Sequence, residues 1–431
     1  MAETQEVRDK VVLVGLNSPV LKKEENADED TMEELSALVE TAGGQVVGSI
    51  LQSRDKPDPH SFIGEGKVEE VKTMVALEGA TLVIFDNELS PSQIRVLTEL
   101  LGVQVIDRSG LILDIFAQRA KTKEGCLQVE LAQYQYLLPR LVGMWTHLER
   151  QAGTSGKGPI GSKGPGETQL ETDRRHIHRK IDKLKAELEE VRRVRSTQRQ
   201  RRQKNEIPVV AIVGYTNAGK STLLNAITGA GIPANNRLFD TLDTTTRLLT
   251  VSDTLDVVIS DTVGFIRKLP HQLVEAFKAT LEELEYADLL LHVIDSSNLQ
   301  WRQQADTVDR LIRELGADTI PCIRVYNKSD LSFPGDRAKE EDAVAISAKT
   351  GEGIPDLLAL IDKKLDKGTK RVTLHLPYDK AGALDSLYRE AKVESVEYAA
   401  TVDVVAVCNP RLLGQLKDYI EGWQPPKEEW E

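Results

Sequence analysis

The stretch GYTNAGKS, residues 214–221, has the residue types and spacing of a phosphate-binding loop. It follows the apolar run PVVAIV, which predicts a strand, and leads into STLLNAIT, which predicts a helix. Gly214 and Gly219 let the backbone wrap around phosphate groups with its N–H groups pointing inward. Lys220 would reach the β- and γ-phosphates, and the hydroxyl of Ser221 would ligate Mg²⁺. The flanking strand and helix favour a nucleotide site over an ordinary glycine turn.

The stretch DTVG, residues 261–264, directly follows another strand-like run. Asp261 could hold Mg²⁺ through a water molecule, and the N–H of Gly264 could contact the γ-phosphate. An aspartate at a strand end is by itself usually a cap, so this interpretation depends on its sharing a domain with the glycine loop. Between the two motifs lies FDTLDTTTR, residues 239–247, where one threonine should ligate Mg²⁺. Spacing alone leaves four candidates, namely Thr241, Thr244, Thr245 and Thr246.

The stretch NKSD, residues 327–330, closes a further strand and indicates which base is bound. The carboxylate of Asp330 can accept hydrogen bonds from the ring N–H and the exocyclic amino group of guanine, a donor pair that adenine lacks. Asn327 and Lys328 would brace the loop and cover the base, and SAK at 347–349 would support it through a backbone N–H. The four motifs in this order predict a GTP-binding domain rather than an ATPase.

The elements that must position these motifs form an α/β domain, which we assign to residues 206–368. Nearly continuous apolar runs alternate there with helical stretches, as expected for a parallel sheet covered by helices on both faces. The runs lie at 208–213, 256–260, 289–295, 320–326 and 343–347.

Two smaller α/β patterns flank the chain. Residues 1–108 predict an N-terminal α/β domain, with strand-like runs at 11–15, 45–50, 82–86 and 103–107 separated by helical stretches. Residues 369–431 predict a C-terminal α+β domain with a short tail. Its strand-like runs lie at 371–376 and 401–407, and its helical stretches at 380–391 and 411–420.

Residues 109–205 predict a linker helix and a long antiparallel helical hairpin. Apolar residues recur in steps of four and three over 127–148 and again over 177–191, which is typical of heptad stripes. Pro139 should kink or split the first helix. The glycine-rich stretch at 151–168 would form the tip. Two helices packed on a core, with an ordinary surface loop, are the alternative.

The tip also combines glycine with Lys157 and Lys163, but it does not predict a second phosphate loop. No strand precedes it, and Pro159 and Pro165 lack the N–H groups that a phosphate cradle needs.

The second helix of the hairpin opposes the charge of the whole chain. The 431 residues have a formal net charge of −13, whereas 171–205 holds thirteen Lys and Arg against six Asp and Glu, a net of +7. The densest part is RRVRSTQRQRRQK, residues 192–204. Such a run is either a solvated face or a contact with the phosphate backbone of a nucleic acid.

The composition indicates a soluble cytoplasmic protein. Cys126, Cys322 and Cys408 are widely spaced, which is typical of free thiols in a reducing compartment. The polar N-terminus has no signal-peptide core, and no apolar run is long enough to span a membrane.

With these motifs in place, the chain resembles the HflX family of translation-factor-class GTPases over essentially its full length. The stretches that carry the resemblance are FIGEGKVEE, VIDRSGLILDIFAQRA, LQVELAQ, GPGETQLETDRR, GYTNAGKS, FDTLDTTTR, DTVGFI and NKSD. Among these, GPGETQLETDRR is the most specific to the family.

The resemblance implies the roles of individual residues. It gives the magnesium threonine to Thr241, with Thr245 as runner-up. The expected metal ligands are Ser221, Thr241 and, through water, Asp261, and the expected catalytic residues are Lys220, Thr241 and Gly264. The residues expected to contact the nucleotide are Gly214, Tyr215, Thr216, Asn217, Ala218, Gly219, Lys220, Ser221, Thr222, Phe239, Asp240, Thr241, Leu242, Asp243, Asp261, Thr262, Val263, Gly264, Asn327, Lys328, Ser329, Asp330, Ser347, Ala348 and Lys349.

Two positions bear on the rate of hydrolysis. Many GTPases place a glutamine after the Asp-x-x-Gly motif to orient the attacking water, but Phe265 stands here, so hydrolysis should be slow unless a partner completes the site. Asn217 stands where potassium-dependent GTPases carry an asparagine that helps to hold K⁺, or it only stabilises the loop; both interpretations stay open.

The resemblance further implies a monomeric GTPase that binds GTP, GDP and the ribosome, chiefly the large subunit and its rRNA. It would split stalled or idle ribosomes into subunits in the GTP-bound state. The alternative from the residues is a GTP-regulated assembly or scaffold protein, acting in ribosome biogenesis or through coiled-coil contacts with proteins.

Overall fold

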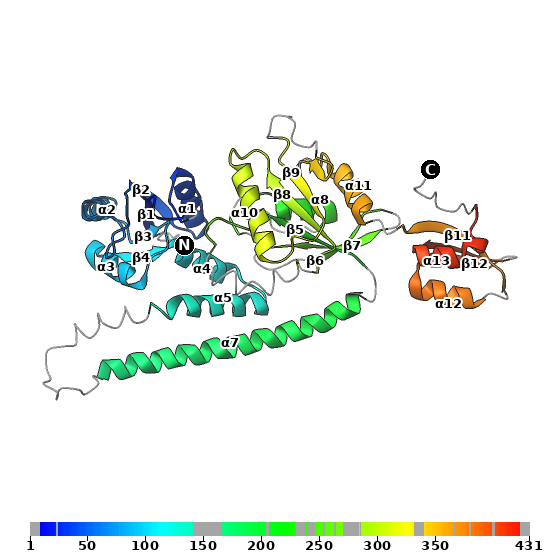
Figure 1. Cartoon of the computed structure of the whole chain (residues 1–431), viewed down its shortest axis with the longest axis horizontal. Coiled ribbons are helices and arrows are strands. Elements are labelled where there is room, and N and C mark those ends of the chain that lie inside the picture. The colour runs from blue at the N-terminus through cyan, green and yellow to red at the C-terminus, as the bar shows by residue number, and fades with distance from the viewer. Residues whose placement is uncertain are drawn as a thin grey trace, which may run out of the picture.

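The computed structural model has four units: the N-terminal, central and C-terminal units follow one another along the molecule, and a helical arm runs alongside the first two (Figure 1). The residues that it describes are 9–22, 25–140, 165–203, 207–229, 238–239, 246–252, 255–262, 264–269, 284, 286–331, 340–365, 368–378, 381–398 and 401–422.

The N-terminal unit is a four-stranded parallel sheet with the strand order β2-β1-β3-β4. Its strands are β1 (Lys10–Asn17), β2 (Gln45–Ser53), β3 (Leu82–Phe85) and β4 (Gln104–Asp107), and its helices are α1 (Glu29–Thr41), α2 (Glu65–Glu78) and α3 (Pro91–Leu101). Capping boxes at Asp28 and Ser90 fix the starts of α1 and α3, because each side chain accepts a hydrogen bond from the third helical N–H. One face of the sheet packs on α2 and α3, and the other packs on α1 and on α4 (Arg108–Arg119).

The arm consists of α5 (Lys123–Leu137) and α7 (Pro165–Gln203), which lie side by side (Figure 1). The predicted heptad stripes meet in a narrow apolar seam of Leu127, Leu131, Ile181, Leu184 and Leu188. Near the end of α5, the hydroxyl of Tyr134 accepts a hydrogen bond from Lys180 of α7 at 2.7 Å. Leu127, near the start of α5, belongs to the same seam as Leu188, which comes later in α7. The two helices therefore run antiparallel.

Proline residues account for the end of α5 and for the start of α7. Helix α5 ends at Leu137, before Pro139, whose ring disfavours a helical residue ahead of it. Helix α7 begins at Pro165, inside the range assigned to the tip, because proline is preset for the first helical position. The rest of the predicted tip, including Lys157 and Lys163, lies outside the described residues.

The central unit is a six-stranded sheet with the strand order β10-β9-β8-β5-β7-β6. Its strands are β5 (Val209–Gly214), β6 (Thr246–Thr250), β7 (Asp256–Asp261), β8 (Leu289–Asp295), β9 (Cys322–Asn327) and β10 (Ala343–Ala345). Its helices are α8 (Lys220–Thr228), α10 (Trp301–Glu314) and α11 (Ile354–Leu365). The predicted strands pair in parallel, and β6 adds an antiparallel edge strand that the sequence did not predict.

The C-terminal unit is a three-stranded antiparallel sheet with the order β11-β13-β12 and a core of its own. Its strands are β11 (Lys370–Leu376), β12 (Lys392–Tyr398) and β13 (Val402–Cys408), and its helical elements are α12 (Ala381–Glu390), α13 (Pro410–Gln415) and a 3₁₀ turn, η2 (Lys417–Tyr419). The sequence predicts all of these except β12, and it predicts α13 and η2 as one helix.

The N-terminal and central units share one hydrophobic core. That core joins apolar residues of β1, α1 and α4 to residues of the central unit, among them Tyr215, Phe239 and Phe265. The rings of Phe116 on α4 and Phe239 meet edge to face, with centroids 4.6 Å apart. Across the described ranges, no helix is both long and apolar enough to cross a membrane.

Candidate nucleotide-binding site

The conformation of the loop between β5 and α8 requires glycine at positions 214 and 219. At Gly214 a Cβ would lie 2.3 Å from the carbonyl oxygen of Val293 on the next strand. Gly219 has a φ of +94°, and a Cβ there would lie 2.2 Å from Nδ2 of Asn327. Both approaches are too close for any side chain, so the glycines let the loop fold tightly over the ends of the strands.

Lys220 is buried at the start of α8, inside this loop. Its Nζ donates to the carbonyl oxygens of Gly214 at 3.1 Å and Tyr215 at 2.9 Å. Burial lowers the pKa of the amine to about 8, against the opposing effect of Asp261. Phosphate oxygens are stronger acceptors than carbonyl oxygens and would favour the charged amine.

Ser221 and Asp261 place two oxygen ligands beside Lys220. The hydroxyl of Ser221 donates to Oδ2 of Asp261 at 2.9 Å, and Asp261 is buried at the end of β7. Hydroxyl and carboxylate oxygens are the ligands that Mg²⁺ prefers, together with phosphate oxygens and water, so the pair fits nucleotide-bound magnesium. Over the part of the chain that the structure describes, no three His, Cys, Asp or Glu side chains form a group that could hold a metal ion.

The segment 264–269 lies directly against the loop. The N–H of Thr216 donates to the carbonyl of Phe265 at 2.7 Å, and the N–H of Phe265 donates to the carbonyl of Gly214 at 3.1 Å. A Cβ on Gly264 would lie 3.1 Å from Nζ of Lys220 and 2.8 Å from Cγ2 of Thr216, so the backbone of Gly264 sits next to the amine. The side chain of Phe265 is 2% exposed and packs in the shared core, away from solvent.

The side chain of Asn327 ties the NKSD motif to the phosphate loop. Its Nδ2 donates to the carbonyl of Ala218 at 2.8 Å, and its Oδ1 accepts from the N–H of Ala348 at 3.0 Å. One residue thus links three of the motifs. The strand ends that carry these motifs, Gly214, Asp261 and Asn327, lie at the carboxyl edge of the sheet, where ligands of α/β proteins bind.

The SAK motif at 347–349 orients Asp330. The hydroxyl of Ser347 donates to Oδ1 of Asp330 at 2.8 Å. Lys328 has a φ of +62° and pairs with Asp295 at 2.7 Å, which holds its stem across the loop. These contacts bring Asp330, Lys328 and Ser347 together as the sequence predicts for a base pocket.

Several predicted residues are not placed. Asp240, Thr241, Leu242, Asp243 and Val263 lie outside the described residues, as do the other candidate threonines Thr244 and Thr245. Phe239, at the start of this motif, is described: it is buried against Phe116 of α4, with a φ of +56°.

The sequence gives no reason to expect the contacts of Tyr215. Its hydroxyl donates to Glu34 on α1 and accepts from the backbone N–H of Arg267 at 2.9 Å. Only the position of Tyr215 inside the glycine loop marks it in the sequence, and its partner Glu34 lies 181 residues away.

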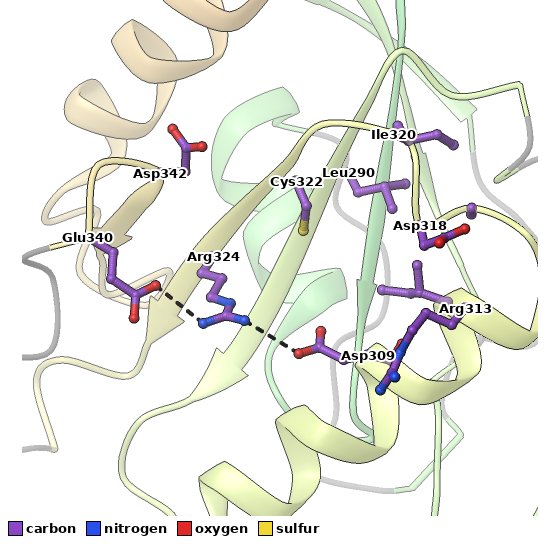
Figure 2. Close-up of a pocket in the computed structure, with 11 residues that line it drawn as sticks. Leu290, Asp309, Arg313, Asp318, Ile320, Cys322, Arg324, Glu340 and Asp342 are labelled. Carbon is purple, nitrogen blue, oxygen red and sulfur yellow. Dashed lines mark hydrogen bonds and ion pairs between the residues drawn. The ribbon is translucent and has the colours of Figure 1, made fainter.

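A separate cavity of about 440 Å³ lies at the opposite edge of the same sheet. It opens beside Leu290 and Cys322, near the amino ends of β8 and β9, and Figure 2 shows Arg324 at its wall between Asp309 and Glu340. The nucleotide motifs follow the carboxyl ends of the strands, so this cavity is not part of their site.

The sheet order, the glycine loop, the buried lysine and the linked guanine motif define a P-loop GTPase. Family models match along the chain: "GTP-binding GTPase N-terminal" at 29–117, "GTP-binding GTPase Middle Region" at 119–202, "50S ribosome-binding GTPase" at 209–328 and "HflX C-terminal domain" at 335–405.

Relatives of known name agree with these matches. The "GTPase HflX" of Caldanaerobacter subterraneus subsp. tengcongensis is 48% identical over 394 residues, covering 91% of this chain and 89% of the relative. The "GTPase HflX" of Escherichia coli is 46% identical over 376 residues, covering 86% and 87%. The chain therefore belongs to the HflX family of GTPases, and it hydrolyses GTP. Among solved structures, a crystal structure of an SsGBP–GDP complex matches 82% of this chain and 98% of its own, at 26% identity and a TM-score of 0.47.

Proposed function

We propose that this GTPase binds the large ribosomal subunit through its arm and, in the GTP-bound state, splits stalled or idle ribosomes in the cytoplasm. The observation that carries the proposal is the match of 209–328 to a family described as a 50S ribosome-binding GTPase. The unusual charge of the arm supports it, because rRNA is an acidic partner of the required size.

Three of the cations of α7 whose side chains the structure describes are exposed to such a partner. The side chains of Arg175, Lys183 and Arg193 are 68%, 78% and 77% exposed, and each pairs with a glutamate of its own helix. Pairs of this kind are worth little in water, and the net of +7 over 171–205 leaves an excess of positive charge. Phosphate contacts release counterions, so binding should weaken steeply as salt is added.

At the nucleotide we propose the following division of roles. Lys220 and the N–H of Gly264 stabilise the γ-phosphate, Ser221 and Thr241 ligate Mg²⁺ with Asp261 behind a water molecule, and Asp330 selects guanine. The buried Phe265 supplies no polar group to orient the attacking water. Hydrolysis by the chain alone should therefore be slow, with the ribosome as the stimulating partner.

The test is the GTPase rate of the full chain with and without purified large subunits, at several salt concentrations. We expect stimulation that declines with salt. Arg199, Arg201 and Arg202 replaced together by Gln should reduce stimulation about tenfold or more at fixed salt. Replacing Lys363, Lys370 and Arg411 by Gln is the matched control, since it removes the same charge from exposed sites outside the arm. Stimulation that is absent in the wild type, or equal in both variants, would contradict the proposal.

The scaffold alternative makes the opposite prediction about salt. A GTP-regulated protein that uses its coiled-coil arm to bind another protein would keep that binding in high salt and after the arginine replacements. Survival of partner binding in both conditions would favour it over the ribosomal role.

For potassium, the position of Asn217 supports both interpretations equally. Its φ of +61° is a conformation that asparagine tolerates, which accounts for the residue without an ion. Its side chain is also exposed, which leaves the amide oxygen accessible. Hydrolysis rates in K⁺ and in Na⁺, for the wild type and for Asn217→Ala, separate the two: a potassium requirement that the variant loses supports the ion.

A further inference from the structure

A buried ionic cluster joins the nucleotide site to the N-terminal unit. Its members are Glu34, Asp86, Arg108, Tyr215 and Lys268, which we call the coupling cluster. Glu34 lies on α1, Asp86 follows β3, and Arg108 begins α4, whereas Tyr215 belongs to the phosphate loop and Lys268 to the segment after DTVG.

Arg108 holds the cluster together. Its guanidinium pairs with Asp86 at 2.8 Å through one nitrogen and with Glu34 through the other. Lys268 pairs with the second oxygen of Asp86, and the hydroxyl of Tyr215 donates to the second oxygen of Glu34. Each carboxylate is therefore shared between one residue of the N-terminal unit and one residue of the central unit.

The charges of the cluster are held in an apolar environment. The side chains of Arg108 and Asp86 are 2% and 0% exposed. Burial by itself would raise the pKa of Asp86, but Arg108 and Lys268 outweigh it and keep the pKa below its ordinary value. Burial, with Glu34 next to it, raises the pKa of Tyr215 well above its ordinary value, so the phenol stays a neutral donor. A buried charge that loses its partner is strongly unfavourable, so such a cluster keeps its geometry or breaks as a unit.

The central-unit members of the cluster contact the parts of the site that face the γ-phosphate. Tyr215 stands between Gly214 and Thr216 of the loop, and its hydroxyl accepts the N–H of Arg267 at 2.9 Å. Lys268 follows directly. Both contacts fix the segment 264–269, whose Gly264 backbone lies beside Lys220. The edge-to-face contact of Phe116 with Phe239 ties the motif before Thr241 to α4 as well.

We propose that Tyr215 and Lys268 are positioning residues for GTP hydrolysis, held by Glu34 and Asp86 so that the N–H of Gly264 points at the γ-phosphate. The hydroxyl of Tyr215 and the amine of Lys268 are engaged by Glu34, Asp86 and the N–H of Arg267, so they act through the backbone of 264–269. The N-terminal unit is thereby part of the GTPase machinery. The inference rests on the nucleotide site proposed above and is independent of the ribosome.

Coupling of this kind is reciprocal. If the cluster orients the backbone that meets the γ-phosphate, a bound γ-phosphate must in turn stabilise the cluster. The amides of α1 and of the start of α4 should then exchange with solvent more slowly with a non-hydrolysable GTP analogue than with GDP, although these helices contact no nucleotide.

The first experiment measures kcat, KM and nucleotide affinity for the full chain carrying Tyr215→Phe or Lys268→Met. Tyr215→Phe removes one hydroxyl, which takes the acceptor from the N–H of Arg267 and the donor from Glu34. We expect kcat to fall about fivefold or more, a larger change than in KM, while the affinity for GDP changes less than about threefold. Lys392→Met is the matched control, because it breaks an ion pair of 2.6 Å with Asp256 that joins the C-terminal and central units.

A double-variant comparison separates positioning from general stability. Glu34→Gln combined with Tyr215→Phe should lower kcat by less than the product of the two single effects, since both changes weaken the shared contact between Glu34 and Tyr215. If Lys268→Met prevents folding, Tyr215→Phe and Glu34→Gln still test whether the cluster positions the 264–269 backbone for hydrolysis. A kcat within about twofold of the wild type in both, with only the unfolding midpoint lowered, would make the cluster a structural joint and overturn the proposal.

Hydrogen exchange tests the coupling independently of the kinetics. Equal protection of α1 with the GTP analogue and with GDP would overturn the coupling even where kcat falls. A wild-type chain that fails to bind GTP would overturn the nucleotide site and this inference together, whereas normal binding and hydrolysis with unaffected variants would overturn the inference alone.

Discussion

At the scale of single residues, the proposed base selection depends on the orientation of one carboxylate. Asp330 receives the hydroxyl of Ser347 on Oδ1 at 2.8 Å, and Ser347 is itself fully buried after β10. A carboxylate accepts two hydrogen bonds from guanine, and an amide at the same place would offer one acceptor and one donor. Xanthine has a carbonyl where guanine has the exocyclic amino group. This carbonyl could accept a hydrogen bond from the amide N–H₂, while the amide oxygen accepts one from the ring N–H.

We therefore expect Asp330→Asn to change the preferred nucleotide. GTP affinity should fall about 100-fold or more, because the guanine amino group would face the amide N–H₂, while affinity for xanthosine triphosphate should rise. Titration with fluorescent analogues of both nucleotides measures the exchange. Asp318→Asn, at the cavity on the far edge of the sheet, is the control and should leave both affinities unchanged. A variant that weakens both nucleotides equally would argue against a direct contact with the base.

The sequence suggests residue roles only where a motif is local. Gly214, Lys220, Ser221 and Asp330 each belong to a short pattern whose chemistry can be read from neighbouring residues. The contact of Tyr215 with Glu34 joins positions 181 residues apart, and no local pattern connects the two residues. The stretch VIDRSGLILDIFAQRA was recognisable as a family feature, but the burial of Arg108 among carboxylates gives it a physical role only in three dimensions.

At the scale of elements, the strands that the sequence missed lie at the edges of sheets. β6 and β12 each pair with one neighbour, and their side chains are mostly exposed. A strand buried on both faces is a run of apolar residues, whereas TRLLT and KVESVEY need no such run, because one face or more meets water. The central strands and the heptad helices were predictable because burial imposes a continuous apolar run on such strands and a heptad period on such helices.

The arm offers a prediction at this scale. Leu188 is buried in the seam between α5 and α7, so Leu188→Ala should cost about 2–4 kcal/mol of the pairing free energy. Faster hydrogen exchange over α5 and α7 would report the loss, and basal GTP hydrolysis should stay unchanged. Val194, which is 49% exposed on the same helix, provides Val194→Ala as the control. A large drop in basal hydrolysis with Leu188→Ala would mean that the seam supports the nucleotide site and not only the arm.

At the scale of the whole molecule, the two flanking units are joined to the central unit in different ways. The N-terminal unit shares a hydrophobic core with it and contributes both carboxylates of the coupling cluster. The C-terminal unit has a separate core, and Lys392 pairs with Asp256 at the start of β7, away from the carboxyl edge of the sheet that carries the site. The sequence predicts both flanking units but not this asymmetry, because it depends on which surfaces meet.

The asymmetry predicts opposite results from two truncations. Removing 369–431 should leave the unfolding midpoint of the remainder and the basal kcat nearly unchanged, because that unit carries its own core. Removing 1–108 takes Glu34 from Tyr215 and Asp86 from Lys268, and it opens the shared core, exposing apolar surface worth about 25 cal/mol per Å². The midpoint should then fall by several degrees and kcat should fall with it, both measurable by calorimetry and single-turnover hydrolysis. The opposite result would contradict this prediction: an unchanged unfolding midpoint and kcat without 1–108, together with a loss of both without 369–431. It would mean that the C-terminal unit, and not the N-terminal unit, supports the GTPase site.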